Sequence, residues 1–95
     1  MNKTETAYAQ RLNLLLKADE IVYWGFEAIK FRLADGAWYT PDFLVQTLDG
    51  LEVHEVKGFF REAAKVRWKV AKELYGGMFR FVLVRRGAGG WTFHK

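Results

Sequence analysis

Two short stretches, Tyr39-Thr40-Pro41-Asp42-Phe43 and Glu55-Val56-Lys57-Gly58, determine how the rest of the chain is interpreted. Successive side chains of a β-strand point to opposite faces, so Glu55 and Lys57 share one face and Val56 lies on the other. Leu48-Asp49-Gly50 separates the two stretches, and an Asp-Gly pair is a strong signal for a β-hairpin. The hairpin brings Asp42 beside Glu55 and Lys57, on neighbouring strands.

These groups suit a hard divalent cation. Proteins bind Mg²⁺ through one or two carboxylates and leave it several water molecules, and Asp42 and Glu55 offer two carboxylates. A lysine near a cation binds its proton less tightly and can position or deprotonate a water molecule, which arginine cannot do. We therefore predict that Asp42 and Glu55 bind a metal ion and that Lys57 acts on the attacking water.

Pro41-Asp42 followed by Glu55-Val56-Lys57 resembles the signature of the PD-(D/E)XK nuclease superfamily. The two fuller stretches resemble its phage branch of endonucleases and Holliday-junction resolvases, and the resemblance covers most of the chain. It implies an α/β, restriction-endonuclease-like fold with an α-β-β-β-α-β core, in which helices flank a mixed central sheet. It also implies Mg²⁺, with Mn²⁺ able to substitute, bound by Asp42, Glu55 and the backbone carbonyl of Val56, with Lys57 at the nucleophile.

Each half of this pattern also has a plainer interpretation. A Glu-x-Lys pair on a strand is often an exposed ion pair, and Pro-Asp is a common turn element. Here both halves occur in order, joined by a turn and followed by a basic helix. The combination favours the nuclease interpretation.

Length and composition limit the other possibilities. With 95 residues, of which 51% are hydrophobic, we expect a single domain over residues 1–95 with a core of its own. The absence of cysteine excludes disulfides and thiolate metal sites. No apolar signal segment begins the chain and no run is long enough to cross a bilayer, so we expect a cytoplasmic protein of a bacterium or a phage-infected host, without a membrane partner.

The first helix is predicted to be capped by Thr4 and to run to about Lys17. Glu5 falls in its first turn, where the helix dipole alone explains an acidic residue. The resemblance implies more, because phage members of the superfamily carry an acid early in the first helix that reaches the metal site. Glu5 matches that position, and a third carboxylate would let the site hold a second ion.

Three further strands are predicted. Ile21–Leu33 is rich in aromatic and β-branched residues and ends at the turn Asp35-Gly36. Its Glu27 could approach the site, although an edge-facing or ion-paired role is favoured. Met78–Arg85 is expected inside the sheet, and Trp91–His94 forms a short closing strand. For His54 and His94, packing or surface roles are favoured because neither has a partner at catalytic spacing.

A second helix is predicted from about Arg61 to Tyr75, ended by Gly76-Gly77. Its sheet-facing residues are expected to be Val66, Val70, Ala71 and Leu74, and its basic residues Arg61, Lys65, Lys69 and Lys72 recur on another side. A solvated charged face would explain the basic residues. Contact with DNA phosphates is the alternative that we favour, because the helix follows directly on Lys57 and the net charge is +4.

The sequence thus predicts a metal-dependent DNA endonuclease that hydrolyses phosphodiester bonds. It is expected to select DNA by structure, as a junction-resolving or nicking enzyme acting on branched DNA. An enzyme that cuts two strands is expected to work as a homodimer. The alternatives are a structure-tolerant nuclease that trims or nicks single strands, a non-catalytic DNA-binding module, and a nuclease subunit that relies on a partner for DNA recognition.

Overall fold

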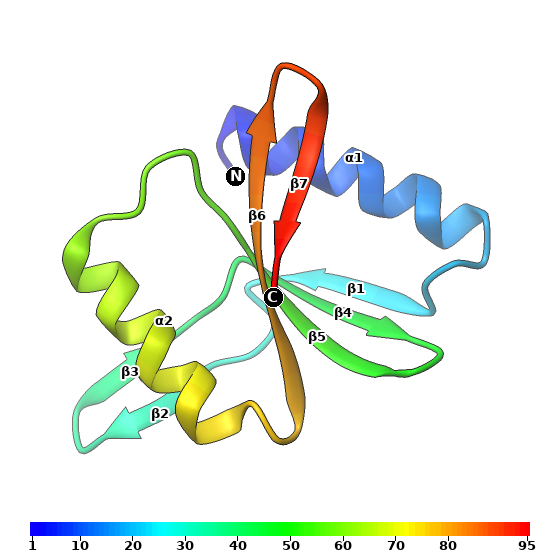
Figure 1. The fold of residues 1–95 in the computed structure, drawn as a ribbon. Coiled ribbons are helices and arrows are strands. Elements are labelled where there is room, and N and C mark those ends of the chain that lie inside the picture. Colours follow the sequence, from blue (N-terminus) through cyan, green and yellow to red (C-terminus); the bar gives the residue numbers. More distant parts are fainter.

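The computed structural model describes residues 1–95 and contains two helices, a five-stranded sheet and a separate hairpin (Figure 1). Within the sheet the strand order is β1-β4-β5-β6-β7, in which only β5 and β6 are parallel neighbours. The chain is therefore an α/β protein with a mixed sheet. In chain order the elements are α1 (Lys3–Lys17), β1 (Tyr23–Phe26), β2 (Phe31–Ala34), β3 (Ala37–Tyr39), β4 (Phe43–Thr47), β5 (Gly50–Val56), α2 (Glu62–Tyr75), β6 (Phe79–Gly87) and β7 (Gly90–His94).

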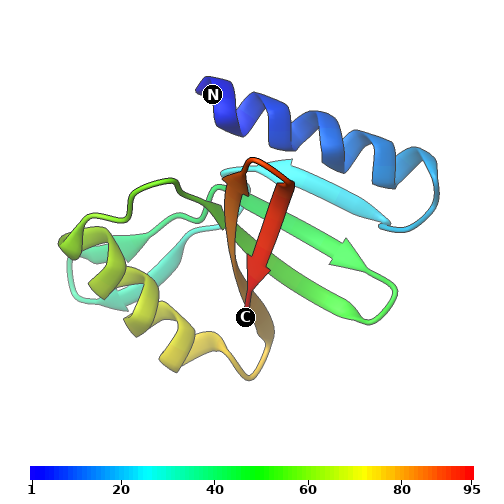
Figure 2. The same ribbon diagram turned by 45° about the horizontal axis from the view of Figure 1, so that its top comes forward.

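The two helices lie on opposite faces of the sheet, and the β2–β3 hairpin packs beside α2 (Figure 2). Each face has its own apolar cluster. Tyr8 and Leu12 of α1 pack against one face, together with Phe43 and Val56. Trp68 of α2 packs against the other face with residues of the hairpin and of β5 and β6. Because both faces are covered, the last four residues of β5 are all buried.

The β4–β5 hairpin forms as predicted. Thr47 pairs with Gly50, so Leu48 and Asp49 form the turn, and Gly50 adopts a φ of +142° that favours glycine. Phe43 pairs with His54 at the far end of the ladder. The strands predicted near Met78–Arg85 and Trp91–His94 are also present, as β6 and β7.

The single strand predicted over Ile21–Leu33 is wrong, because the chain turns within it. β1 ends at Phe26, and Glu27 adopts a left-handed backbone conformation with φ of +49°. The chain then crosses to the other face, where Phe31 is buried in the α2 cluster. Aromatic density indicates strand in both halves, but it carries no information about a change of face.

The predicted cap of α1 is also wrong. The helix begins at Lys3 with Asn2 as its N-cap: the Asn2 side chain accepts a hydrogen bond from Glu5 N at 2.8 Å, and Glu5 Oε1 accepts one from Asn2 N at 2.9 Å. This reciprocal pair is a capping box. It explains Glu5 in part by local structure, and the end of the helix at Lys17 agrees with the prediction.

The sheet-facing side of α2 differs from the predicted one. Trp68 and Ala71 are buried, with Ala64 and Tyr75 packed beside them. Val66, Val70 and Leu74 are exposed, so of the four residues predicted to pack on the sheet only Ala71 does. The spacing 64, 68, 71, 75 is as helical as the predicted one, so periodicity alone does not distinguish the two stripes.

Neither α1 nor α2 has the length and apolar character that a membrane-spanning helix needs.

The corrected face of α2 can be tested with two substitutions on different sides of the helix. Trp68→Ala leaves a cavity in the α2 cluster and is expected to lower the free energy of unfolding by about 3–5 kcal/mol. Val66→Ala, at an exposed position, is expected to change it by less than about 0.5 kcal/mol. Urea denaturation of both variants measures the difference, and equal losses would contradict the assignment.

Candidate active site

Asp42 and Glu55 meet where β4 begins and β5 ends. The pairing of Phe43 with His54 places the residue before β4 next to Glu55. Asp42 N lies 3.3 Å from Glu55 Oε1, and Val56 N donates to Asp42 Oδ2 at 2.8 Å. Both carboxylates are buried, with 7% and 5% of the residue exposed. The structure therefore brings together the two acids that the sequence places on neighbouring strands.

Lys57 and Tyr39 complete this group. Lys57 Nζ lies 3.4 Å from Glu55 Oε2, on the face that the alternation of β5 predicts. The Tyr39 hydroxyl, at the end of β3, donates to Glu55 Oε1 at 2.5 Å. Burial, with the neighbouring Glu55 charge, raises the pKa of Tyr39 far above its ordinary value, so the phenol keeps its proton. Tyr39 belongs to the motif, but no spacing rule predicts that its hydroxyl reaches residue 55.

Burial makes both carboxyl groups of the site harder to ionise than in water. Burial raises the pKa of Asp42 to about 7, and the charge of Glu55 adds to this, while Val56 N and Lys57 oppose it. Burial also raises the pKa of Glu55, against the hydrogen bond from Tyr39 and the charge of Lys57. Two acids thus share one nearby ammonium group, and a proton or a cation stabilises the pair.

The residues present fit a divalent cation. Val56 N donates to Asp42 Oδ2, and Asp42 Oδ1 accepts no hydrogen bond within the chain. A carboxylate oxygen with free lone pairs beside a second carboxylate is the donor set that Mg²⁺ accepts. No third Asp, Glu, His or Cys joins them in a group that could hold a metal ion. Protein ligands are thus limited to Asp42, Glu55 and the adjoining backbone of Val56.

The other two predicted acids lie outside this group. Glu5 is near enough for its charge to raise the pKa of Asp42, but its Oε1 accepts the capping hydrogen bond from Asn2. Glu27 is exposed and forms no ion pair, although its backbone N donates to Asp42 O at 2.8 Å. Glu27 therefore supports the position of Asp42 through the backbone alone.

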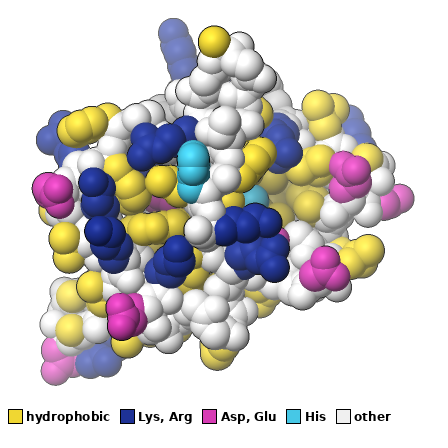
Figure 3. All heavy atoms as spheres, in the orientation of Figure 1, with side chains coloured by type: hydrophobic (Ala, Val, Ile, Leu, Met, Phe, Trp, Pro, Cys, Tyr) yellow, Lys and Arg dark blue, Asp and Glu magenta, His cyan; other side chains and the backbone are white.

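The predicted basic residues follow one flank of α2. Arg61 stands at the N-cap position, Lys65 is half-buried, and Lys69 and Lys72 are exposed. At 3.6 residues per turn the four lie on the same side of the buried Trp68 face. Figure 3 shows one face of the molecule. On it, Lys and Arg side chains extend from the α2 side toward the middle, and Asp and Glu lie mainly at the periphery. These four residues thus form one flank of α2, whereas Arg67 lies on the other side of Trp68.

The opposite face of β5 carries a second polar group, absent from the sequence predictions. His54 is buried; its Nδ1 lies 2.6 Å from the Tyr8 hydroxyl and its Nε2 lies 2.8 Å from Glu52 Oε1. The hydrogen bond from His54 lowers the pKa of Glu52, so Glu52 is an acceptor and Nε2 carries the hydrogen. The Tyr8 hydroxyl, which can both donate and accept, satisfies Nδ1. The packing role predicted for His54 is confirmed.

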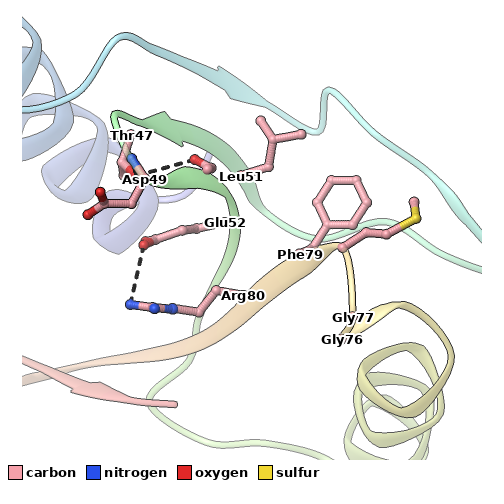
Figure 4. Close-up of a pocket in the computed structure, with 10 residues that line it drawn as sticks. Thr47, Asp49, Leu51, Glu52, Gly76, Gly77, Phe79 and Arg80 are labelled. Atoms are coloured by element: carbon pink, nitrogen blue, oxygen red, sulfur yellow. Dashed lines mark hydrogen bonds and ion pairs between the residues drawn. The ribbon is translucent and has the colours of Figure 1, made fainter.

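A hollow in the surface, drawn in Figure 4, is lined by residues outside the candidate site. It has a volume of about 280 Å³ and is lined by the β4–β5 turn and the chain between α2 and β6. Glu52 and Arg80 line it at a separation of 4.0 Å, with Asp49 beside them. The turn and the Asp42–Glu55 pair are at opposite ends of β5, so this hollow takes no part in the candidate site.

Comparison with known proteins adds no relative. No family model, no curated protein and no solved structure matches the chain. The interpretation of the site therefore depends on its own geometry and on the motif residues.

The raised pKa of Asp42 predicts a particular pH dependence of stability. The folded pKa of about 7 exceeds the unfolded value of about 4, so between these pH values the folded chain holds a proton that the unfolded chain has released. The contribution to stability is complete below pH about 4 and is lost as the pH rises to about 7.

We therefore expect the wild type, without added metal, to lose stability relative to Asp42→Asn as the pH rises through this window. Asparagine is neutral throughout and keeps an acceptor for Val56 N. Urea denaturation of both proteins at a series of pH values measures the difference. A difference that does not vary with pH would contradict the assignment.

Proposed function

We propose that the chain is a Mg²⁺-dependent DNA endonuclease of the PD-(D/E)XK type. The observation that carries the proposal is the contact between Asp42 and Glu55 across β4 and β5, with Lys57 on the same face as Glu55. Two buried acids with raised pKa values, one of them with a carboxylate oxygen that accepts no hydrogen bond, are costly to maintain in a small protein. Such perturbed groups cluster at functional sites.

The order of the elements supports this proposal. When the β2–β3 hairpin and the last strand, β7, are set aside, α1, β1, β4, β5, α2 and β6 follow one another as α-β-β-β-α-β. The three first strands are antiparallel neighbours, and β6 lies parallel to β5 after the α2 crossover. This is the arrangement expected of a restriction-endonuclease-like core, with the motif residues at the start of its second strand and the end of its third.

The proposed roles follow from the contacts. Asp42 and Glu55 hold Mg²⁺, or Mn²⁺ in its place, together with the Val56 carbonyl, and Glu5 is a further carboxylate in electrostatic range. The cation would polarise the scissile phosphate and lower the pKa of a water molecule. The ammonium group of Lys57, 3.4 Å from Glu55, would orient that water by donating a hydrogen bond to it, and Lys57 would accept the proton of the water only after releasing one of its own. Tyr39 holds Glu55 in place by its hydrogen bond.

The substrate proposed is DNA of unusual structure, including branched DNA. Arg61, Lys65, Lys69 and Lys72 would contact backbone phosphates without reading bases. A homodimer belongs to the proposal, because cleavage of two strands needs two sites, and sedimentation at micromolar concentration with and without DNA tests it. DNA binding that is unaffected by chelation, with no nicking of supercoiled plasmid, would instead favour a non-catalytic binding module or a subunit that needs a partner.

The chemistry is tested by Asp42→Asn and Lys57→Ala. Each is expected to lower Mg²⁺-dependent cleavage by about 10²-fold or more, because one removes a metal ligand and the other the group that acts on water. Lys17→Ala, at the far end of α1, is a control of the same charge change as Lys57→Ala. Cleavage of junctions, flaps, duplexes and single strands is measured for all three. Wild-type rates in Asp42→Asn or Lys57→Ala would remove the proposed chemistry.

The basic flank of α2 is tested by the salt dependence of binding. Replacing Lys65, Lys69 and Lys72 together by Ala is expected to weaken binding to all DNA structures alike. On duplex DNA the slope of log K against log salt concentration should become shallower by up to about 0.9 for each phosphate that the variant no longer neutralises. Fluorescence anisotropy with Ca²⁺ in place of Mg²⁺ measures binding, and an unchanged slope would show that these lysines are only a solvated surface.

A further inference from the structure

Phe59 is an exposed aromatic residue that follows Lys57 of the candidate site closely in the sequence. It is 80% exposed, and no other aromatic side chain of the chain is exposed to that extent. It stands two residues after Lys57, at the start of the segment that joins β5 to α2. A single exposed apolar residue is ordinary on a protein surface, so the exposure of Phe59 alone does not indicate a binding site.

The backbone on both sides of Phe59 is held in place. Before it, Gly58 O accepts a hydrogen bond from Arg85 Nη1 at 3.0 Å, and Lys57 N donates to Val84 O at 3.0 Å. After it, Phe60 is buried in the α2 cluster, with its ring centroid 6.3 Å from that of Trp68. Of two consecutive phenylalanines, one thus anchors the segment and the other is directed into solvent.

Cationic residues lie on both sides of this ring in the sequence. Lys57 precedes it by two residues and Arg61 follows it by two, and Glu62 is the one acid from Gly58 to Lys69. A purely apolar partner covering Phe59 would also have to desolvate these charges, at a cost in free energy. A nucleotide offers both complements at once, since its base has a π-face and its phosphates are anionic.

We infer that Phe59 is a stacking platform for an unpaired nucleobase close to the scissile phosphate. The inference rests on the proposed function and narrows its substrate. Bases inside a duplex are stacked on one another and cannot lie on an external ring, so the platform selects strands with an unpaired nucleotide near the cleavage point. Single strands, flaps and the openings of junctions belong to this class, and a continuous duplex does not.

The test compares Phe59→Ala with Phe59→Trp in the full chain. The probes are a single-stranded oligonucleotide and a matched duplex, both with 2-aminopurine, measured with Ca²⁺ so that no cleavage interferes. Phe59→Ala is expected to weaken single-strand binding about tenfold, to leave duplex binding within about twofold, and to abolish the quenching of 2-aminopurine on binding. Phe59→Trp should keep both the single-strand binding and the quenching. Leu48→Ala, at a comparably exposed residue at the other end of β5, is the matched control.

Each outcome decides the inference. Single-strand binding and quenching that survive in Phe59→Ala would overturn it, as would an equal loss on single strand and duplex, or a wild type that binds neither probe. Circular dichroism confirms that the variants fold. Failure of the nuclease proposal looks different: wild-type protein would bind the single strand through Phe59, yet no DNA would be cut with Mg²⁺. If instead DNA is cut with Mg²⁺ and Phe59→Ala binds the single strand as the wild type does, the stacking inference fails and the nuclease proposal stands.

Discussion

The burial of two carboxylates against each other, across the start of β4 and the end of β5, is the constraint on which the other features depend. Burial raises the pKa of both carboxyl groups, and the charge of Glu55 raises the pKa of Asp42 further. The chain places around them an amide from Val56, a phenol from Tyr39 and an ammonium group from Lys57. Tyr39 is the last residue of β3, Val56 is the last residue of β5, and Lys57 follows it. The β2–β3 hairpin, the five-stranded sheet and the α2 cluster therefore all hold one small polar group in place.

The sequence was most informative where local rules determine geometry. Strand alternation and one turn signal were enough to place Asp42, Glu55 and Lys57 together, because the pairing register follows from the length of the hairpin. Predictions failed where tertiary packing chooses between local options that are equally good. Val66, Val70 and Leu74 have helical spacing, but so have Ala64, Trp68, Ala71 and Tyr75, and only the shape of the opposing surface selects the second set. The reversal at Glu27 has no local signal, since a left-handed conformation is uncommon for glutamate.

The partners of the candidate site were beyond the reach of the sequence for a related reason. Tyr39 reaches Glu55 because the hairpin that carries it folds back beside α2, where the Tyr39 ring packs against Phe31 and Trp68. His54 finds Tyr8 across 46 positions of the chain. Such contacts join elements whose relative placement is known only once the sheet order is known. The metal ligands could be proposed from a motif, whereas the donors that orient them could not.

The bond between Tyr8 and His54 limits how α1 can sit on the sheet. Apolar side chains tolerate sliding, but a helix displaced by one turn moves its residues by about 5.4 Å, far beyond hydrogen-bond reach. His54 would then hold an unsatisfied nitrogen in the core, at a cost of about 1–3 kcal/mol. The hydrogen bond between Tyr8 and His54 therefore fixes the position of α1 along the sheet. His54 and Glu55 are neighbours in β5 and face opposite sides of the sheet. The hydrogen bond between Tyr8 and His54 therefore also fixes the distance from the first turn of α1 to the Asp42–Glu55 pair.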